Sequence, residues 1–358
     1  MASVYVPILK GKEGELSALE ELSTAVSELI LPLIEVPPVP YDFVNERPTK
    51  TLDAHVAAVV ERLHVWKERP LYVDLPSFGD TEHLDDGTVA VRRVLDDCRT
   101  VDIDCIPVVS SSSTGAYLAG VRDHLQGRGA ICIRLTDADF DEEGNTEPKA
   151  EVERLLRAAG LRDFGAADLI LDLQNIPQDL GRATLLARAI IGEAPHLDEW
   201  RRVVVSAASF PENLSDVSAS AVTNLPRTEW DLWRRLKKRG MARADIVFGD
   251  YGITHPTLTE LDPRTMRMSA SIRYTTLQHW LILKGKNVRQ YGFDQYFDLC
   301  RTLVELPDYS GEGFSWGDGF IARCARGATG PGNATTWRKV GTNHHLTLVA
   351  RDLAGGDA

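Results

Sequence analysis

The sequence predicts an α/β fold: a TIM-like (β/α)8 barrel over residues 1–252, followed by a C-terminal β-hairpin/glycine-rich extension over residues 253–358 that packs on the barrel. Three observations predict it. Eight short apolar runs recur before residue 251, the stretches after them carry apolar residues at helical spacing, and successive runs begin 25 to 43 residues apart. Such strand–helix alternation requires right-handed crossovers and a parallel sheet, and eight repeats close most simply into a barrel.

The individual elements follow from this pattern in chain order. We expect eight strands, at residues 4–10, 29–36, 71–75, 105–109, 130–135, 169–173, 203–206 and 246–248. Apolar residues at helical spacing predict helices between them, at residues 16–26, 53–63, 89–98, 117–125, from 149 onward, 182–191 and 230–238.

Proline is the main objection to the barrel. Pro7, Pro32 and Pro107 lie within three of the predicted strands, and a central strand cannot accommodate proline in the middle of its ladder, because proline lacks the N–H donor. The objection weakens if each proline takes the first ladder position. The alternative is a doubly wound open sheet, but no G-x-G-x-x-G or G-x-x-x-x-G-K-[ST] motif follows any predicted strand, so neither a dinucleotide site nor a P-loop is indicated.

The pattern changes after Asp250. The remaining chain predicts a hairpin at residues 269–276 and 280–284, a helix at 293–306, a glycine-rich run at 311–332 and a final strand at 345–350. So short and glycine-rich a segment would bury little core of its own, so we expect it to wrap on the barrel.

Composition limits the class of protein. The 358 residues carry a formal net charge of −12, which disfavours a broad nucleic-acid-binding surface or a membrane-surface protein but allows a local basic pocket. Five cysteines form no C-x-x-C pair, which indicates reduced thiols. The first residues enter a strand without the basic region of a signal peptide, and no apolar run approaches the roughly 20 residues of a membrane span, so we expect a cytoplasmic location and no membrane partner.

Two blocks of sequence resemble a known family. The first is residues 5–15 with Pro-Leu-Ile-Glu-Val at 32–36, and the second is Phe-Ser-Trp-Gly-Asp at 314–318 with residues 337–338 and 341–345. Both resemble the beta family proteins, named for the beta protein of T-even phage and found widely in bacteria. Members tend to be encoded near mobile or defence genes, so the resemblance implies a role in antiviral defence or phage–host conflict. It supplies no catalytic residues.

Polar residues at the ends of the apolar runs form the candidate site. In a parallel barrel the βα loops gather where the strands end, so these residues should converge at one mouth. They are Lys10, Glu35, Asp74, Ser110, Arg134, Asp172, Ser206 and Asp250. Charges in a barrel need partners or a ligand. Pairing of Lys10 with Glu35 and of Arg134 with Asp172 is the purely structural interpretation, and we favour a site because the pattern recurs in all eight runs.

Two kinds of chemistry suit the four carboxylates. Glu35, Asp74, Asp172 and Asp250, above all Glu35, Asp172 and Asp250, could bind a hard cation such as Mg²⁺, which retains waters for a phosphate-bearing substrate. Without a metal, one catalytic carboxylate could act as general base and another as general acid, if their environments separate their pKa values.

Further candidates lie outside the run ends. Lys10, Lys12, Arg134, Arg273 and Arg338 could bind an anionic small molecule or nucleotide. Tyr274 follows Arg273 on the opposite face of the hairpin and is another candidate for ligand binding. Trp316 and Trp337 could stack on a base or sugar, or could simply anchor the tail.

The pair His344-His345 could supply a proton-transfer group to the site. Neighbours on a strand point to opposite faces, so at most one of the two can reach it. Because a glycine-rich tail with these polar and aromatic residues costs much entropy to order, we expect it to close over the mouth, with Arg338 and one histidine within reach of the strand ends.

Two classes of function stay open. One is a barrel hydrolase acting on a phosphorylated small molecule, nucleotide or nucleic-acid end. The other is a non-enzymatic recognition protein that binds a ligand or a partner protein through the mouth and the extension.

Overall fold

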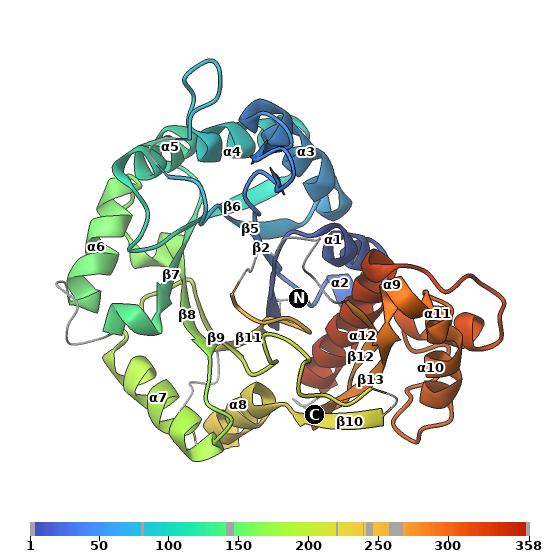
Figure 1. The fold of residues 1–358 in the computed structure, drawn as a ribbon. Coiled ribbons are helices and arrows are strands. Elements are labelled where there is room, and N and C mark those ends of the chain that lie inside the picture. The colour runs from blue at the N-terminus through green and yellow to red at the C-terminus, as the bar shows by residue number, and fades with distance from the viewer. Residues whose placement is uncertain are drawn as a thin grey trace.

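The computed structural model describes residues 4–79, 82–140, 147–219, 221–238, 240, 246–257 and 268–355. Eight parallel strands close into a barrel in the order β1-β11-β9-β8-β7-β6-β5-β2, so barrel strands that follow one another in the chain are neighbours (Figure 1). They are β1 Tyr5–Leu9, β2 Leu33–Glu35, β5 Pro70–Asp74, β6 Asp104–Val109, β7 Ile131–Thr136, β8 Ala167–Asn175, β9 Arg202–Ala208 and β11 Val247–Asp250. The predicted TIM-like barrel is therefore confirmed.

Helices surround the barrel (Figure 1). They are α1 Glu13–Glu20, α2 Thr24–Ser27, α3 Leu52–Leu63, α4 Ala90–Thr100, α5 Gly115–Leu125, α6 Pro148–Ala158, α7 Leu180–Glu193 and α8 Thr228–Lys238, with 3-10 helices at His64–Trp66, Asp137–Phe140 and Phe164–Ala166 and a small hairpin of β3 Tyr41–Asp42 and β4 Arg47–Pro48. Thr51, Thr114 and Asp179 cap α3, α5 and α7 by accepting hydrogen bonds from backbone N–H groups of the first turn. The apolar sides of the helices and the outward side chains of the strands form the main core.

The stagger of the strands resolves the proline objection. β1 pairs with β11 as far as Pro7; on its other side Tyr5 bridges Ile30, and pairing with β2 starts at Ile8. β6 likewise pairs with β5 as far as Pro107 and with β7 from Val108. Both prolines therefore lie in mid-strand, contrary to the first-position expectation, but each is the last residue paired with one neighbour and directly precedes the ladder with the other strand. The missing N–H costs little there, because no continuous ladder runs through that position.

The extension forms a second layer beside the barrel. β12 Ser269–Thr275 and β13 His279–Asn287 make the predicted hairpin, and β10 Ala221–Pro226 joins β13 to give the order β10-β13-β12. The helices here are α9 Val288–Tyr291, α10 Gln295–Val304 and α11 Trp316–Ala325. These elements bury a separate apolar cluster that includes Tyr274, Leu283, Cys300, Ile321 and Trp337. The expectation that the extension buries little core of its own is wrong, and the division at residue 252 stays a prediction.

The predicted final strand at residues 345–350 is wrong, because these residues belong to the long helix α12 Ala334–Gly355. α12 lies against α1, α2 and β1 on one side and against α11 and β12 on the other. A helix covered on several sides needs no polar stripe, so its period is hidden in the sequence. α12 thus fills the place of the helix that follows the eighth barrel strand, on the side of the barrel (Figure 1).

Candidate functional site

Alternation along the barrel strands decides which side chains enter the barrel. Every second residue of a strand points into the barrel, and these residues form an inner apolar layer that includes Val6, Ile8, Leu33, Ile170 and Val204. The residues between them point outward and pack against the helices. Beyond this layer, where the strands end, the inward-pointing positions continue with polar residues that contact one another. We call these residues the mouth cluster: Lys10, Glu35, Asp74, Arg134, Asp172, Ser206 and Tyr251.

Arg134 lies at the centre of the mouth cluster. Its Nη1 is 2.8 Å from Glu35 Oε1 and 2.7 Å from Asp74 Oδ2. Its Nη2 and Nε donate to Asp172 Oδ2 at 2.6 and 3.0 Å. Burial alone would lower the pKa of Arg134, but the phenol of Tyr251 and the three carboxylates raise it well above its ordinary value. The guanidinium therefore stays charged and ties together the ends of four strands.

Lys10 binds one of these carboxylates, Glu35. Its Nζ donates to Glu35 and to the backbone carbonyl of Pro256, and it lies 5.0 Å from the centre of the Tyr251 ring. Lys10 is 5% exposed and Glu35 is 8% exposed. The segment after β11 thus covers this side of the cluster. Both ion pairs of the purely structural interpretation, Lys10 with Glu35 and Arg134 with Asp172, are present.

Tyr251 is the member of the cluster that the sequence analysis missed. Its hydroxyl donates to Asp172 Oδ2 at 2.5 Å and accepts from Arg134 Nη2 at 2.7 Å. Its inward orientation could have been predicted from the sequence, because Tyr251 lies four residues after Val247, and residues separated by an even number along a strand point to the same side. Because the sequence analysis took the acidic residue Asp250 as the inward end of this run, it assigned Tyr251 no place in the barrel.

Asp250 is not part of the mouth cluster, so its predicted convergence with the other carboxylates is wrong. It faces outward, where the Tyr5 hydroxyl donates to Oδ1 at 2.5 Å and His345 Nε2 lies 2.9 Å from Oδ2. Burial opposes ionisation, but His345 and Arg227 hold the pKa of Asp250 below its ordinary value, while burial lowers the pKa of His345. A neutral His345 that donates to an ionised Asp250 satisfies both shifts.

Asp74 is the least satisfied carboxylate of the cluster. Burial raises its pKa to about 6, although Arg134 opposes the shift, and the charge of Glu35 adds to it. Arg134 Nη1 is the one hydrogen-bond donor to its side chain among the described residues. The Asp74 side chain is 12% exposed, whereas that of Asp172 is fully buried. Asp74 is therefore the carboxyl of the mouth best placed to exchange a proton near neutral pH.

The family model described as Beta protein matches residues 5–351, nearly the whole chain. The chain belongs to the Beta protein family. The resemblance seen in the two terminal blocks is thereby confirmed. A comparison with curated proteins gives no match.

In this member of the Beta protein family, the predicted metal ligands Glu35, Asp172 and Asp250 do not come together. Asp250 points away, and the Arg134 guanidinium stands between the other two. Within the described ranges, no group of three or more His, Cys, Asp or Glu side chains is arranged to hold a metal ion. An arginine thus takes the position predicted for Mg²⁺.

The two histidines of α12 serve different parts of the molecule. His344 Nδ1 lies 2.8 Å from Asp318 Oδ2, and its ring stacks on Tyr274 at 3.9 Å. Tyr274 donates to Asp318 Oδ1 at 2.8 Å, so this group is buried inside the extension. His345 alone reaches a strand end, at Asp250. The expectation that at most one histidine reaches the strand ends agrees with this arrangement, although a helix rather than a strand separates the two rings.

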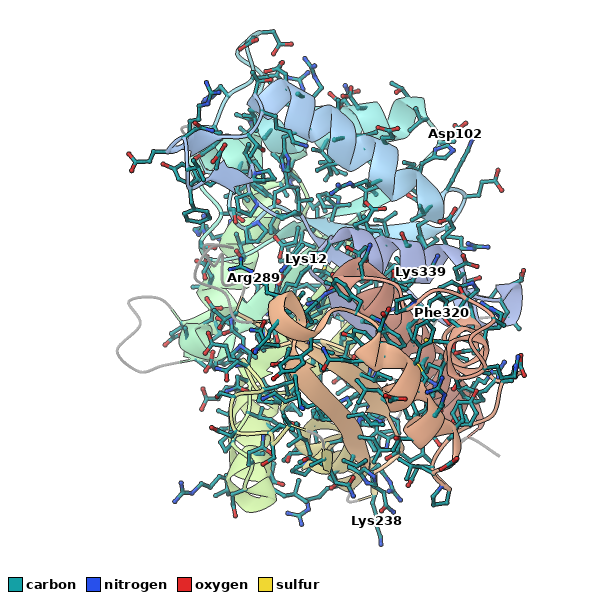
Figure 2. All side chains as sticks on the ribbon, turned by 45° about the vertical axis from the view of Figure 1, so that its right-hand side comes forward. Lys12, Asp102, Lys238, Arg289, Phe320 and Lys339 are labelled. Atoms are coloured by element: carbon teal, nitrogen blue, oxygen red, sulfur yellow. The ribbon has the colours of Figure 1, made fainter. Side chains whose placement is uncertain are left out.

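The two tryptophans pack within the extension. Trp316 stacks on Phe320, and Trp337 stacks on Tyr296 with ring centres 4.2 Å apart. Figure 2 shows Phe320 on the side of the molecule that the extension forms. These contacts fit the interpretation that the tryptophans anchor the tail, since each ring stacks on another aromatic ring of the extension.

The remaining predicted cations lie around α1 and α12. Lys12 is the residue that precedes α1. Arg338 pairs with Glu15 of α1 at 3.3 Å and does not reach the mouth. Because α12 lies on the side of the barrel, the expected lid over the strand ends is not formed. Arg273 and Arg338 instead line one cavity beside the extension.

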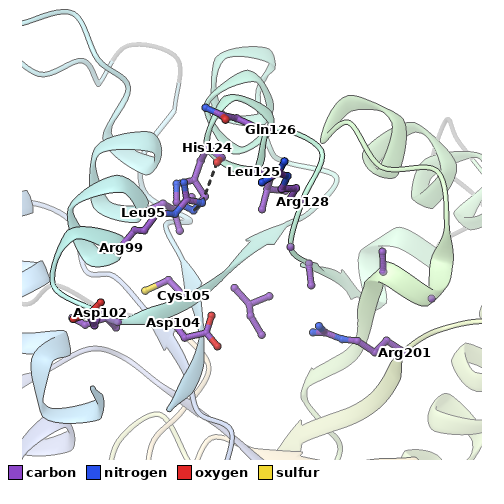
Figure 3. A pocket seen from close by; sticks show the side chains of 16 residues that line it. Leu95, Arg99, Asp102, Asp104, Cys105, His124, Leu125, Gln126, Arg128 and Arg201 are labelled. Atoms are coloured by element: carbon purple, nitrogen blue, oxygen red, sulfur yellow. Dashed lines mark hydrogen bonds between the residues drawn. The ribbon is translucent and has the colours of Figure 1, made fainter. Parts of the chain in front are cut away.

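A further cavity, of about 910 Å³, lies at the opposite end of the barrel, where β6, β7 and β8 begin (Figure 3). It is lined in part by Arg99, Asp102 and Arg201, and Figure 2 places Asp102 far from the extension. Arg99 contacts His124 Nε2 at 2.8 Å, and Arg201 donates to Asp168 at 2.7 and 2.5 Å. Arg201 thus pairs with a carboxylate, whereas Arg99 contacts the ring and the backbone carbonyl of His124, whose Nδ1 lies 2.6 Å from Asp96 Oδ1.

No helix among the described residues is long and apolar enough to cross a membrane.

Proposed function

We propose that this protein is a hydrolase that acts at the barrel mouth on a phosphorylated small molecule, nucleotide or nucleic-acid end, with Asp74 as the proton-transferring group. The observation that carries the proposal is the state of Asp74: a pKa raised to about 6, a single side-chain hydrogen-bond donor among the described residues, and partial exposure. A carboxyl with a pKa near the working pH is effective as a general acid, because it both holds and releases the proton readily.

The charge of the cluster sets the protonation state in which an anionic substrate could enter the mouth. Lys10 and Arg134 carry two positive charges and Glu35, Asp74 and Asp172 three negative ones, so the cluster is neutral only when Asp74 is protonated. In the proposed step, water attacks the substrate, the bond to the leaving oxygen breaks, and Asp74 gives that oxygen its proton. The proton of the attacking water passes to solvent and Asp74 takes up another, which closes the cycle.

The test is a screen of phosphate esters and nucleotides between pH 5 and 8, with Asp74→Asn beside the wild type. We expect the substitution to reduce turnover by about 100-fold or more, and wild-type turnover to fall above about pH 6 as Asp74 loses its proton. Asp123→Asn, on the exposed side of α5, is the matched control and should leave turnover unchanged. Turnover that survives Asp74→Asn would assign the chemistry to another group.

A recognition protein without turnover is the second candidate, and one observation favours it. Arg134 and Lys10 are already paired with the carboxylates of the mouth, and Pro256 covers part of it, so the cluster also works as a sealed support for the barrel. Under this alternative, no compound in the screen is hydrolysed, and affinity purification from cells recovers a stable ligand or partner protein.

We place either activity in the cytoplasm and in phage–host conflict, a role that the family resemblance implies. Plaque counts on cells that carry the wild type or Asp74→Asn test it. Equal plaque counts with the wild type and with an empty vector would contradict this role without bearing on the chemistry.

A further inference from the structure

A cavity of about 650 Å³ lies where the extension meets the barrel. We call it the junction pocket. Its walls come from the segment after β9, Ile253 after β11, β12, β13 and the start of α12, and its polar lining includes Ser269, Ser271, Arg273, Lys284, Tyr296 and Arg338. Three cations and one carboxylate, Glu212, line this cavity, so its lining is net positive in a chain whose net charge is −12.

Arg273 has no carboxylate partner in the described parts of the chain. Its Nη1 donates to the backbone carbonyl of Ile253 at 2.8 Å, and its guanidinium lies 4.9 Å from the centre of the Phe210 ring. These contacts orient the group without pairing it with a carboxylate, and the charge of Glu15 acts on it more weakly than that of Arg338. A guanidinium has five N–H donors, and the others make no further hydrogen bond within the ranges that the structure describes.

Arg338 adds a second positive charge to the same cavity. It reaches the pocket from α12 and pairs with Glu15 at 3.3 Å on its other side, with its side chain 27% exposed. Burial, and then the charge of Arg338, lower the pKa of Arg273 to about 10. The two guanidinium groups therefore repel each other, and an anion between them would remove that cost.

The rest of the pocket is suited to holding an anion in place. Lys284 donates to the carbonyls of Leu214 and Val217 at 2.6 and 2.7 Å, which fixes the segment after β9 as a wall. Ser271 and Arg273 are two residues apart on β12, so their side chains share one face, and the serine hydroxyl can add a donor beside the arginine. The arrangement of two planar forks with a nearby hydroxyl matches the tetrahedral oxygens of a phosphate group.

We propose that the junction pocket binds a phosphate-bearing small molecule through Arg273 and Arg338. This site is separate from the mouth and does not depend on hydrolysis there. Its occupant joins two elements of the extension, because Arg273 belongs to β12 and Arg338 to α12, the helix that packs on α1 of the barrel.

The experiment is calorimetric titration of the full chain with inorganic phosphate and with pyrophosphate, alongside melting curves in phosphate and in chloride at equal ionic strength. We expect binding with about one phosphate per chain and a melting temperature that rises in phosphate but not in chloride. Arg273→Gln and Arg338→Gln should each weaken binding by about tenfold or more, since each removes a charge-assisted fork. Arg326→Gln, which removes an exposed pair with Glu312 in the same extension, should leave binding unchanged.

Ser271→Asp keeps the proposal testable if an arginine variant fails to fold. It places a carboxylate between the arginines, so it should abolish phosphate binding and raise the melting temperature in chloride. Asp74→Asn should retain phosphate binding at the junction pocket, which separates failure of this site from failure of the mouth. The proposal is overturned if Arg273→Gln binds phosphate as the wild type does, or if phosphate stabilises the protein no more than chloride.

Discussion

Arg134 and Arg273 occupy opposite situations in one molecule. Arg134 contacts three carboxylates in the barrel mouth; burial would lower its pKa, but Tyr251 and these carboxylates raise it well above the ordinary value. Arg273 contacts a backbone carbonyl and an aromatic ring, and burial with the nearby charge of Arg338 lowers its pKa to about 10. The first arginine is thus satisfied by the fold and the second is not.

The difference separates a structural role from a binding role. A buried cation with all its donors paired to carboxylates holds strands together, and removal of either partner leaves an uncompensated charge. A partly buried cation beside a like charge can be neutralised by an anion from outside the chain. By this criterion the mouth supports the barrel except at Asp74, and the junction pocket holds a cation, Arg273, that pairs with no carboxylate among the described residues.

The largest effect that tests this contrast is expected from Arg134→Met. The substitution leaves Glu35, Asp74 and Asp172 without their shared cation, so we expect the free energy of unfolding to fall by about 3–5 kcal/mol. Arg273→Met is the matched control and should cost about 1 kcal/mol or less, because it removes a carbonyl hydrogen bond and a ring contact. Urea unfolding of both variants measures the difference. Equal losses would mean that the two arginines have the same role.

The titration of Asp74 should make the free energy of unfolding depend on pH. Its folded pKa of about 6 lies above its ordinary 3.8, so the folded state holds the proton more tightly than the unfolded chain. The associated stability is fully present below about pH 4 and is lost as the pH rises through 6, by about 3 kcal/mol at most. Asp74→Asn removes this titration, so its free energy of unfolding should fall less between pH 4 and pH 8. Parallel curves for variant and wild type would show that Asp74 has an ordinary pKa.

Tyr251→Phe should have a smaller effect. It removes the hydroxyl that donates to Asp172 and accepts from Arg134, at an otherwise unchanged ring. We expect a loss of about 1–2 kcal/mol in the free energy of unfolding, as for a buried hydrogen bond to a charged group. Tyr291→Phe, on an exposed ring of the extension, is the control for removal of a hydroxyl. If both substitutions are neutral, Tyr251 contributes only packing.

Much of the barrel could be predicted because its signal is local and repeated. Each strand and its following helix are adjacent in sequence, and the inward residues Glu35, Asp74, Arg134 and Asp172 end apolar runs in the correct phase. Asp250 was misplaced because a run of four residues does not fix the phase of alternation, and an error of one residue exchanges the inner and outer faces.

The parts that escaped prediction depend on tertiary contacts. α12 looks like a strand over residues 345–350, because neighbours on several sides remove the polar stripe that marks a surface helix. The junction pocket joins Arg273 and Arg338, which are 65 residues apart and lie in elements of different type. Both arginines were candidate anion ligands by residue type, but only the packing of α12 beside β12 brings them to one cavity.

The smallest change in stability, and the sharpest test of the comparison, is expected from Arg338→Ala. Its pair with Glu15 is partly exposed, so its removal should lower the free energy of unfolding by about 1 kcal/mol or less in chloride. The same removal also relieves the repulsion on Arg273, which offsets part of that loss. In phosphate the effect should be larger, because the variant lacks one of the two guanidinium groups that hold the ligand. Its melting temperature should therefore no longer rise when phosphate is added. A variant that is less stable in chloride yet gains as much from phosphate as the wild type would make Arg338 a structural residue, like Arg134.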